Sequence, residues 1–164
     1  MKFSNAIKFA FPSAVLGCLT LGLAPTSAFA STSVPTTFNV TATVQSTCVI
    51  SATAMSFGTY TAVVANSTST VTVTCTNTTP YTVALNAGTA TGATVTNRSM
   101  TGTSSALLGY ALYSDTGRTV NFATTASITG SGAAQPITIY GQIPAGEYVA
   151  PGSYTDTITA TVTY

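Results

Sequence analysis

The segment YTDTITATVTY, residues 154–164, alternates between two kinds of side chain almost without a break. The two sets are Ile158, Ala160, Val162 and Tyr164 against Thr157, Thr159, Thr161 and Thr163. A period of two puts successive side chains on opposite faces of a strand, whereas a helix needs apolar residues every three or four positions. Threonine is branched at Cβ and favours strands as well. We therefore expect a strand here with one buried face.

Other segments share this periodicity, and none has a helical one. They are residues 69–76, 80–86, 106–114 and 135–143. The third of these is apolar on both faces, which predicts a central strand. Turn residues lie between the segments, at 115–118, 144–146 and 151–152, with a longer surface loop at 86–103 that has room for one short strand. Short strands separated by turns predict an all-β, antiparallel sandwich.

The first thirty residues have the features of a secretory signal peptide. Lys2 and Lys8 precede an apolar run at residues 9–23, and Ala28-Phe29-Ala30 forms a cleavage site of the A-x-A type. We expect cleavage after Ala30. No later apolar run is long enough for a membrane helix, so no membrane span is expected after cleavage.

The charge that remains after cleavage argues against nucleic-acid binding. Removing Lys2 and Lys8 leaves two arginines against three acidic residues, a net charge of −1. Such a chain has no basic field for nucleic acid.

Cys48 and Cys75 are the cysteines left after cleavage, and export to an oxidising compartment predicts a structural disulfide between them.

Catalytic and metal-binding chemistry lacks its usual residues. The sequence contains no histidine, and no lysine remains after cleavage. Asp115, Glu147 and Asp156 are scattered in turn-like or strand-edge settings, and we interpret them as solvated charges. We therefore predict no catalytic residues, no metal site and no cofactor.

The N-terminal part of the mature chain carries a further alternating segment, PTTFNVTATVQ, residues 35–45. Its apolar positions are Phe38, Val40, Ala42 and Val44. Only three residues separate Val44 from Cys48, and none of them is Gly, Pro, Asn or Asp, so the segment is not expected to fold back. A projecting strand with an apolar face requires a partner. No strand follows residues 154–164 to cover them, so we expect assembly by strand donation between copies.

Several motifs resemble the spore coat protein U family, the pilin subunits of archaic chaperone–usher pili. They are FNVTATVQSTCVIS (38–51), FGTY (57–60), VTVTCT (71–76) and ITIYGQIPAGEYVAPGSYTDTITATVTY (137–164). The resemblance implies an incomplete immunoglobulin-like sandwich that lacks its last strand. A donated strand would complete it, first from a periplasmic chaperone and then, after export through an outer-membrane usher, from another subunit.

Residue by residue, the resemblance implies a donor segment at 31–44 and a pilin domain at 45–164. The donor side chains would be Val34, Phe38, Val40, Ala42 and Val44, with the donor face ending between Ala42 and Thr47. The receiving edge would comprise Ile158, Ala160, Val162 and Tyr164. The implied function is a structural subunit of a pilus or surface fibre, supporting adhesion and biofilm.

Two alternatives remain open. One is a structural protein of a spore or cyst coat, as the family name suggests. The other is a carbohydrate-binding sandwich or tip adhesin, whose sugar-stacking candidates are Tyr60, Tyr81, Tyr110, Tyr113 and Tyr148.

Overall fold

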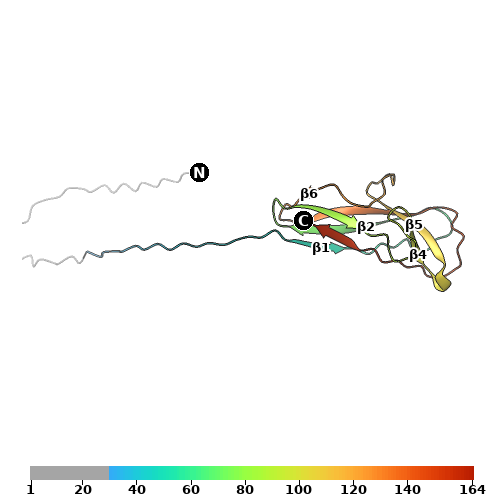
Figure 1. Cartoon of the computed structure of the whole chain (residues 1–164), viewed down its shortest axis with the longest axis horizontal. Helices are drawn as coiled ribbons and strands as arrows, with labels where there is room; N and C mark the ends of the chain where they lie inside the picture. Colours follow the sequence, from blue (N-terminus) through green and yellow to red (C-terminus); the bar gives the residue numbers. More distant parts are fainter. Residues whose placement is uncertain (1–29) are drawn as a thin grey trace, which may run out of the picture. The chain divides into compact units, whose positions relative to one another are not determined.

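A computed structural model describes residues 30–164, and the chain divides into two units, Met1–Thr41 and Ala42–Tyr164 (Figure 1). Apart from Ala30, the predicted signal peptide lies outside the described residues. Residues 30–41 have no regular secondary structure, and their side chains are exposed. Every strand in the described part of the chain belongs to the second unit.

The second unit is built from short strands and one turn of 3₁₀ helix. The strands are β1 (Cys48–Ala52), β2 (Ala65–Cys75), β3 (Pro80–Leu85), β4 (Arg98–Thr101), β5 (Leu107–Tyr113), β6 (Ile128–Thr129), β7 (Gln135–Ile143) and β8 (Ala160–Thr163). The 3₁₀ turn, η1 (Thr103–Ser105), connects β4 to β5. The predicted all-β class is therefore confirmed.

The strands form two antiparallel sheets. One has the order β1-β2-β7-β5-β4, and the other has the order β6-β3-β8. The longest ladder joins β2 to β7, from Ala65 opposite Ile143 to Val73 opposite Gln135. β5 lies between β7 and β4, so the prediction of a central strand at residues 106–114 is confirmed. β1 and β8 are edge strands, each with one unpaired side.

The core lies between the sheets and follows the period of two. In β2, Val71, Val73 and Cys75 are buried while the threonines between them are partly exposed. β3 and β5 contribute buried residues at the same spacing. Burying each large aliphatic side chain contributes about 1.5–3 kcal/mol before the entropy of ordering is subtracted. Alternation in the sequence thus maps directly onto the two faces of each sheet.

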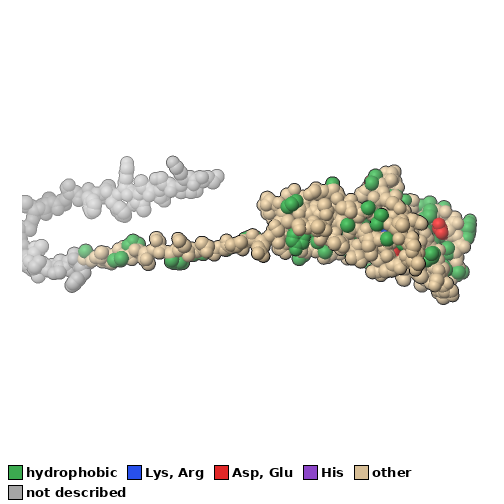
Figure 2. Space-filling view, in the orientation of Figure 1, with side chains coloured by type: hydrophobic (Ala, Val, Ile, Leu, Met, Phe, Trp, Pro, Cys, Tyr) green, Lys and Arg blue, Asp and Glu red, His purple; other side chains and the backbone are tan. Residues whose placement is uncertain are grey.

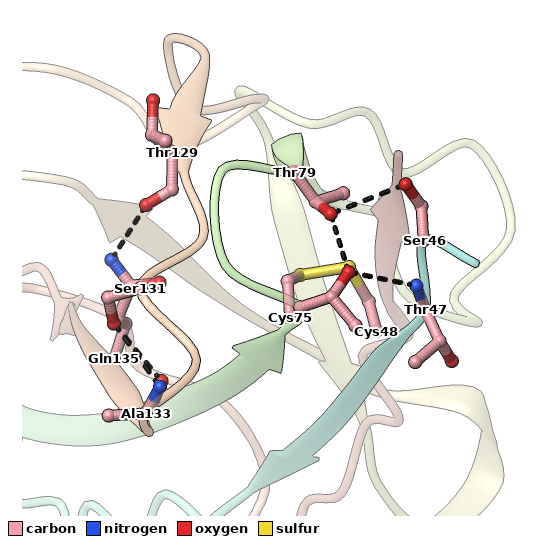
Figure 3. The surroundings of a disulfide bond; sticks show 10 residues. Ser46, Thr47, Cys48, Cys75, Thr79, Thr129, Ser131, Ala133 and Gln135 are labelled. Atoms are coloured by element: carbon pink, nitrogen blue, oxygen red, sulfur yellow. Dashed lines mark hydrogen bonds between the residues drawn. A yellow bond between two sulfur atoms is a disulfide. The ribbon is translucent and has the colours of Figure 1, made fainter. Parts of the chain in front are cut away.

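Cys48 and Cys75 form a disulfide, as the sequence predicts, and face each other in the β1–β2 ladder (Figure 3). Residues just before Cys48 also bind the β2–β3 turn: the Thr47 amide donates to Thr76 Oγ1 at 3.2 Å, and Thr47 O accepts from the Thr76 amide at 2.9 Å. Closing the loop of 27 residues contributes roughly 3–4 kcal/mol on the chain-entropy model. The start of β1 is therefore firmly attached to the core.

Two strand boundaries differ from the prediction. β2 begins at Ala65 rather than Ser69, because β7 offers partners as far as Ile143. β8 covers only residues 160–163 of the expected 154–164. Its partner β3 ends at Leu85, opposite Ala160, and before Ala160 the pairing with a strand is reduced to one bridge, between Thr155 and Thr101 of β4. The alternating pattern in this segment is real, but a strand also needs a neighbour.

Candidate functional site

An open groove lies between the unpaired sides of the two sheets. One wall is the chain that follows β1, residues 52–57, and the other is the chain that leads into β8, residues 154–160. The floor is largely apolar and includes Val71, Leu112 and Ile139. The groove has a volume of about 400 Å³. A second cavity of about 680 Å³ shares Met55, Phe57, Met100 and Tyr154 with it, so the two are adjacent.

The first wall depends on a glycine in β7. Met55 and Phe57 cover Gly141 so closely that a Cβ there would lie 2.3 Å from Met55 Sδ. Phe57 also meets the Tyr110 ring edge-on, with the ring centroids 6.2 Å apart. The hydroxyl of Ser69 donates to Thr53 O at 2.6 Å and fixes the start of this wall. The strand pattern gave no indication of this segment, although the FGTY motif includes part of it.

The second wall forms one bridge with β4, between Thr155 and Thr101, and is otherwise held largely by side chains. Tyr110 Oη donates to Asp156 Oδ2 at 2.6 Å. Asp156 Oδ1 accepts from the amide and the hydroxyl of Thr89, each at 2.8 Å. Two further hydrogen bonds join Asn86 to Thr159. Our interpretation of Asp156 as a solvated charge is therefore wrong: its carboxylate connects the groove wall to β5 and to the loop that follows β3.

Arg98 lies beneath the same loop and is fully buried, with 0% of its surface exposed. Its guanidinium donates to the carbonyl oxygen of Asn86 from Nε at 3.0 Å and from Nη2 at 2.8 Å, and also to the carbonyl oxygens of Val95 and Phe122. Burial lowers the pKa of Arg98, while Tyr110 and Asp156 raise it. Arg98 and Asp156 thus hold the loop from two sides.

The predicted donor side chains are all exposed. Phe38 is 84% exposed, and Val34, Val40, Ala42 and Val44 are exposed as well. Hydrophobic side chains recur along this segment in Figure 2, whereas the face of the sandwich shown there carries few charged ones. Leaving Phe and Val in water forgoes about 1.5–3 kcal/mol for each side chain. The segment therefore has a strong drive to bury one face.

The predicted receiving residues occupy three different settings. Ile158 and Ala160 line the groove. Val162 lies opposite Val83 of β3 and packs against the core. Tyr164 follows the end of β8 and is 57% exposed, outside the groove lining. The structure thus brings Ile158 and Ala160 to the groove together with Met55, Phe57 and Tyr110.

The family is shown by direct comparison. A family model described as the Spore Coat Protein U domain matches residues 34–161. The chain belongs to this family. This Spore Coat Protein U domain is similar to Protein U of Myxococcus xanthus. The two are 31% identical over an alignment of 181 residues, gaps included, which covers 98% of this chain and 99% of Protein U.

A solved structure shares the fold of this Spore Coat Protein U domain. It is the complex of CsuC and CsuE, a chaperone–tip adhesion subunit pre-assembly complex from the archaic chaperone–usher Csu pili of Acinetobacter baumannii. The TM-score is 0.56 and the identity 23%, over 74% of this chain and 40% of the matched chain. The predicted immunoglobulin-like sandwich is therefore confirmed as the fold.

Two further observations bear on the sequence-based expectations for this Spore Coat Protein U domain. Among residues 30–164, no cluster of three or more His, Cys, Asp or Glu side chains is placed to bind a metal ion. Within the same residues, no helix has the length and apolarity that a membrane crossing requires.

The five candidate tyrosines of this Spore Coat Protein U domain do not all lie on one surface, although Tyr60 and Tyr148 both line the second cavity. Tyr81 and Tyr110 are buried, so their rings are not available to a sugar. Tyr60 is partly buried and donates to Pro144 O at 2.6 Å, which fixes the loop at 144–146. Only Tyr148, at 89%, is largely exposed among the five candidates.

Acid should destabilise this Spore Coat Protein U domain partly through Asp156. Partial burial, the largest single influence, raises the pKa of Asp156, but hydrogen bonds from Tyr110, Thr89 and Thr157 outweigh it and lower the pKa below its ordinary value. Because the folded-state pKa is lowered, the stabilisation is present above about pH 4 and is lost as the pH falls through the folded-state pKa.

We expect Asp156→Asn to lower stability at pH 7 and to lose less stability than the wild type between pH 6 and pH 2.5. Urea denaturation at several pH values measures both effects. Glu147→Gln is the matched control, because the hydrogen bond that Glu147 makes uses its backbone amide rather than its carboxylate. An acid-induced loss in Asp156→Asn equal to that of the wild type would contradict the assignment.

Proposed function

We propose that this protein is a secreted structural subunit that polymerises by donor-strand exchange. Residues 31–44 of one copy would enter the groove of another. The observation that carries the proposal is the open, largely apolar groove between residues 52–57, which follow β1, and residues 154–160, which lead into β8; β1 and β8 are both edge strands. The exposed alternating face of Phe38 and its neighbours supplies side chains of matching chemistry.

The energetics support a long-lived assembly. Four or five side chains entering the groove contribute about 1.5–3 kcal/mol each before the cost of association and ordering. Backbone hydrogen bonds to a free edge add to this and set the register. Ten residues of strand reach roughly 33 Å, enough to cross a sandwich. Such a polymer dissociates slowly, which suits a fibre that bears load.

The proposed fibre is a pilus of the chaperone–usher type that supports adhesion and biofilm. A periplasmic chaperone would fill the groove first, and an outer-membrane usher would export the subunit to the cell surface. The shared fold of the Csu complex supports this route, because that complex pairs a chaperone with a pilus subunit before assembly. The proposed partners are therefore copies of this chain or related pilins, a chaperone and an usher.

Deleting residues 31–44 tests the proposal. We expect the full-length mature chain to give a ladder of heat-resistant species on a denaturing gel, and the deletion variant to give monomer alone. A synthetic peptide of residues 34–45 should bind the deletion variant and raise its thermal stability, which shows that the groove remains functional. A ladder that persists after the deletion would contradict the donor assignment.

A structural role in a spore or cyst coat is the second candidate, and the family description together with the similarity to Protein U favours it. Strand exchange would serve a coat as well as a fibre. Genes for a chaperone and an usher beside this one would support the pilus. Their absence, together with recovery of the protein from purified coats, would support the coat.

A further inference from the structure

The large hydrophobic side chains that remain exposed are concentrated in a few places. They are Val34, Phe38, Val40, Val44, Val49, Val63, Val64, Leu107, Val120, Tyr148 and Tyr164. The first four lie in the donor segment. We call the end of the sandwich that carries the start of β1, the turn at 76–79 and Tyr164 the proximal end. The opposite end, with the loops at 58–64, 102–106 and 144–152, is the distal end.

The strand register defines these two ends. Cys48 of β1 faces Cys75 at the proximal end, while Ala65 of β2 faces Ile143 at the distal end. β8 runs toward the proximal end, because Ala160 faces Leu85 and Thr163 faces Thr82. In Figure 1 the C-terminus accordingly lies at the same end as the start of β1, away from β4.

The distal end carries four of the exposed hydrophobic residues, which we call the distal patch: Val63, Val64, Leu107 and Tyr148. Hydrogen bonds hold its loops together: the amide of Gly146 donates to Ala62 O at 3.0 Å, and the amide of Glu147 donates to Tyr60 Oη at 3.1 Å. Figure 2 shows hydrophobic side chains gathered at this end of the sandwich. The patch is therefore apolar and built on fixed loops.

The direction of the donated strand determines what reaches the distal patch. A strand added to β8 in the usual antiparallel sense runs from the proximal to the distal end of the receiving copy. Its C-terminal end, at Val44, therefore emerges at the distal end. Only residues 45–47 then separate it from Cys48, which belongs to the donor's own sandwich. The four residue steps from Val44 to Cys48 span at most about 14 Å. The donor's proximal end must therefore lie against the receiver's distal end.

A return of the segment into its own groove does not meet these conditions. Because Cys48 lies at the proximal end, a segment folded back from it would run parallel to β8. It would also have to reverse within Gln45-Ser46-Thr47, which contains no Gly, Pro, Asn or Asp. The register thus favours a second copy as the donor.

We propose that the distal patch is the contact surface for the proximal end of the copy whose donor segment fills the groove. The donor's Val49 and Tyr164, both exposed at its proximal end, supply the apolar side chains that meet the patch. This inference rests on the proposed strand exchange and adds a second contact to it. It explains why the exposed hydrophobic residues lie mainly in the donor segment and at the two ends.

Thiol labelling tests the contact. Tyr148→Cys is prepared in two forms: the deletion variant lacking residues 31–44 with its groove filled by the 34–45 peptide, and the polymer. Both have a filled groove, but only the polymer places a second sandwich at the distal end. We expect maleimide to label the Tyr148→Cys thiol at least about tenfold more slowly in the polymer. Val120→Cys, an exposed hydrophobic position away from both ends, should label equally in the two forms.

Equal labelling of Tyr148→Cys in the two forms would overturn the inference while leaving strand exchange intact. A chain that forms no polymer would overturn the proposed function, and the inference with it. If the added thiol disturbs the native disulfide, hydrogen exchange of chains without an added cysteine replaces the labelling experiment. The amides of residues 144–150 should then be more protected in the polymer than in the peptide-filled form, and equal protection would overturn the inference.

Discussion

Replacing Phe38 with aspartate is expected to abolish polymer formation. The phenyl ring is the largest side chain on the alternating face, and its transfer into the groove contributes about 1.5–3 kcal/mol. Aspartate loses this contribution and would place a charge in an apolar groove, which costs several kcal/mol more. A combined loss of about 4 kcal/mol or more corresponds to roughly a thousandfold weaker binding.

Calorimetric titration of 34–45 peptides, with and without the substitution, into the deletion variant measures this loss. The gel ladder of the full mature chain provides an independent readout. Asn39→Asp is the matched control, because it adds the same charge one residue away on the opposite face of the strand. Loss of binding in both variants to the same extent would show that charge alone matters and that Phe38 is not an anchor.

Replacing Arg98 with alanine should cost the domain about 3–5 kcal/mol of folding free energy. The guanidinium is fully buried and donates to the carbonyl oxygens of Asn86, Val95 and Phe122, which accept from no other side chain among residues 30–164. Each buried acceptor left without a donor costs about 1–3 kcal/mol, and the vacated volume adds a cavity term. Asp156 would also lose its favourable electrostatic partner.

Urea denaturation of Arg98→Ala in the peptide-filled form measures this cost, with the m-value checked for constancy. Arg118→Ala is the control, since it removes the other arginine among the described residues. Arg118 is only partly buried; its Nε donates to Gly141 O at 3.3 Å, and its guanidinium lies 5.8 Å from the centre of the Tyr140 ring. We expect a loss of about 1 kcal/mol or less there. Equal losses in the two variants would contradict a special role for Arg98.

Strands were the most predictable part of this fold. β2, β3, β5 and β7 each alternate in sequence as they do in burial, because a period of two is a local consequence of strand geometry. The disulfide was equally predictable from the sequence, since only one pairing of two cysteines exists. The exact extent of β8 was not, because it depends on where β3 ends, a property of a different segment.

The candidate groove could be predicted only in part. Ile158 and Ala160 were identified from the alternation of their own segment, and both line the groove. Met55 and Phe57 were missed because residues 53–64 have neither a strand nor a helix period, and their position depends on the absence of a side chain at Gly141. Asp156 was misjudged because its neighbours in sequence are polar, whereas its partner Tyr110 comes from β5.

By itself, the sequence determined the all-β class, the faces of the strands, the disulfide and the apolar face of residues 38–44. These features depend on spacing along the chain, which backbone geometry turns directly into direction in space. Only the tertiary structure decided which edges stay unpaired, that a groove opens between residues 52–57 and 154–160, and that Arg98 and Asp156 are joined through one loop. These features arise where distant segments meet, and a side chain's partners there are set by the packing of the whole domain rather than by its neighbours in sequence.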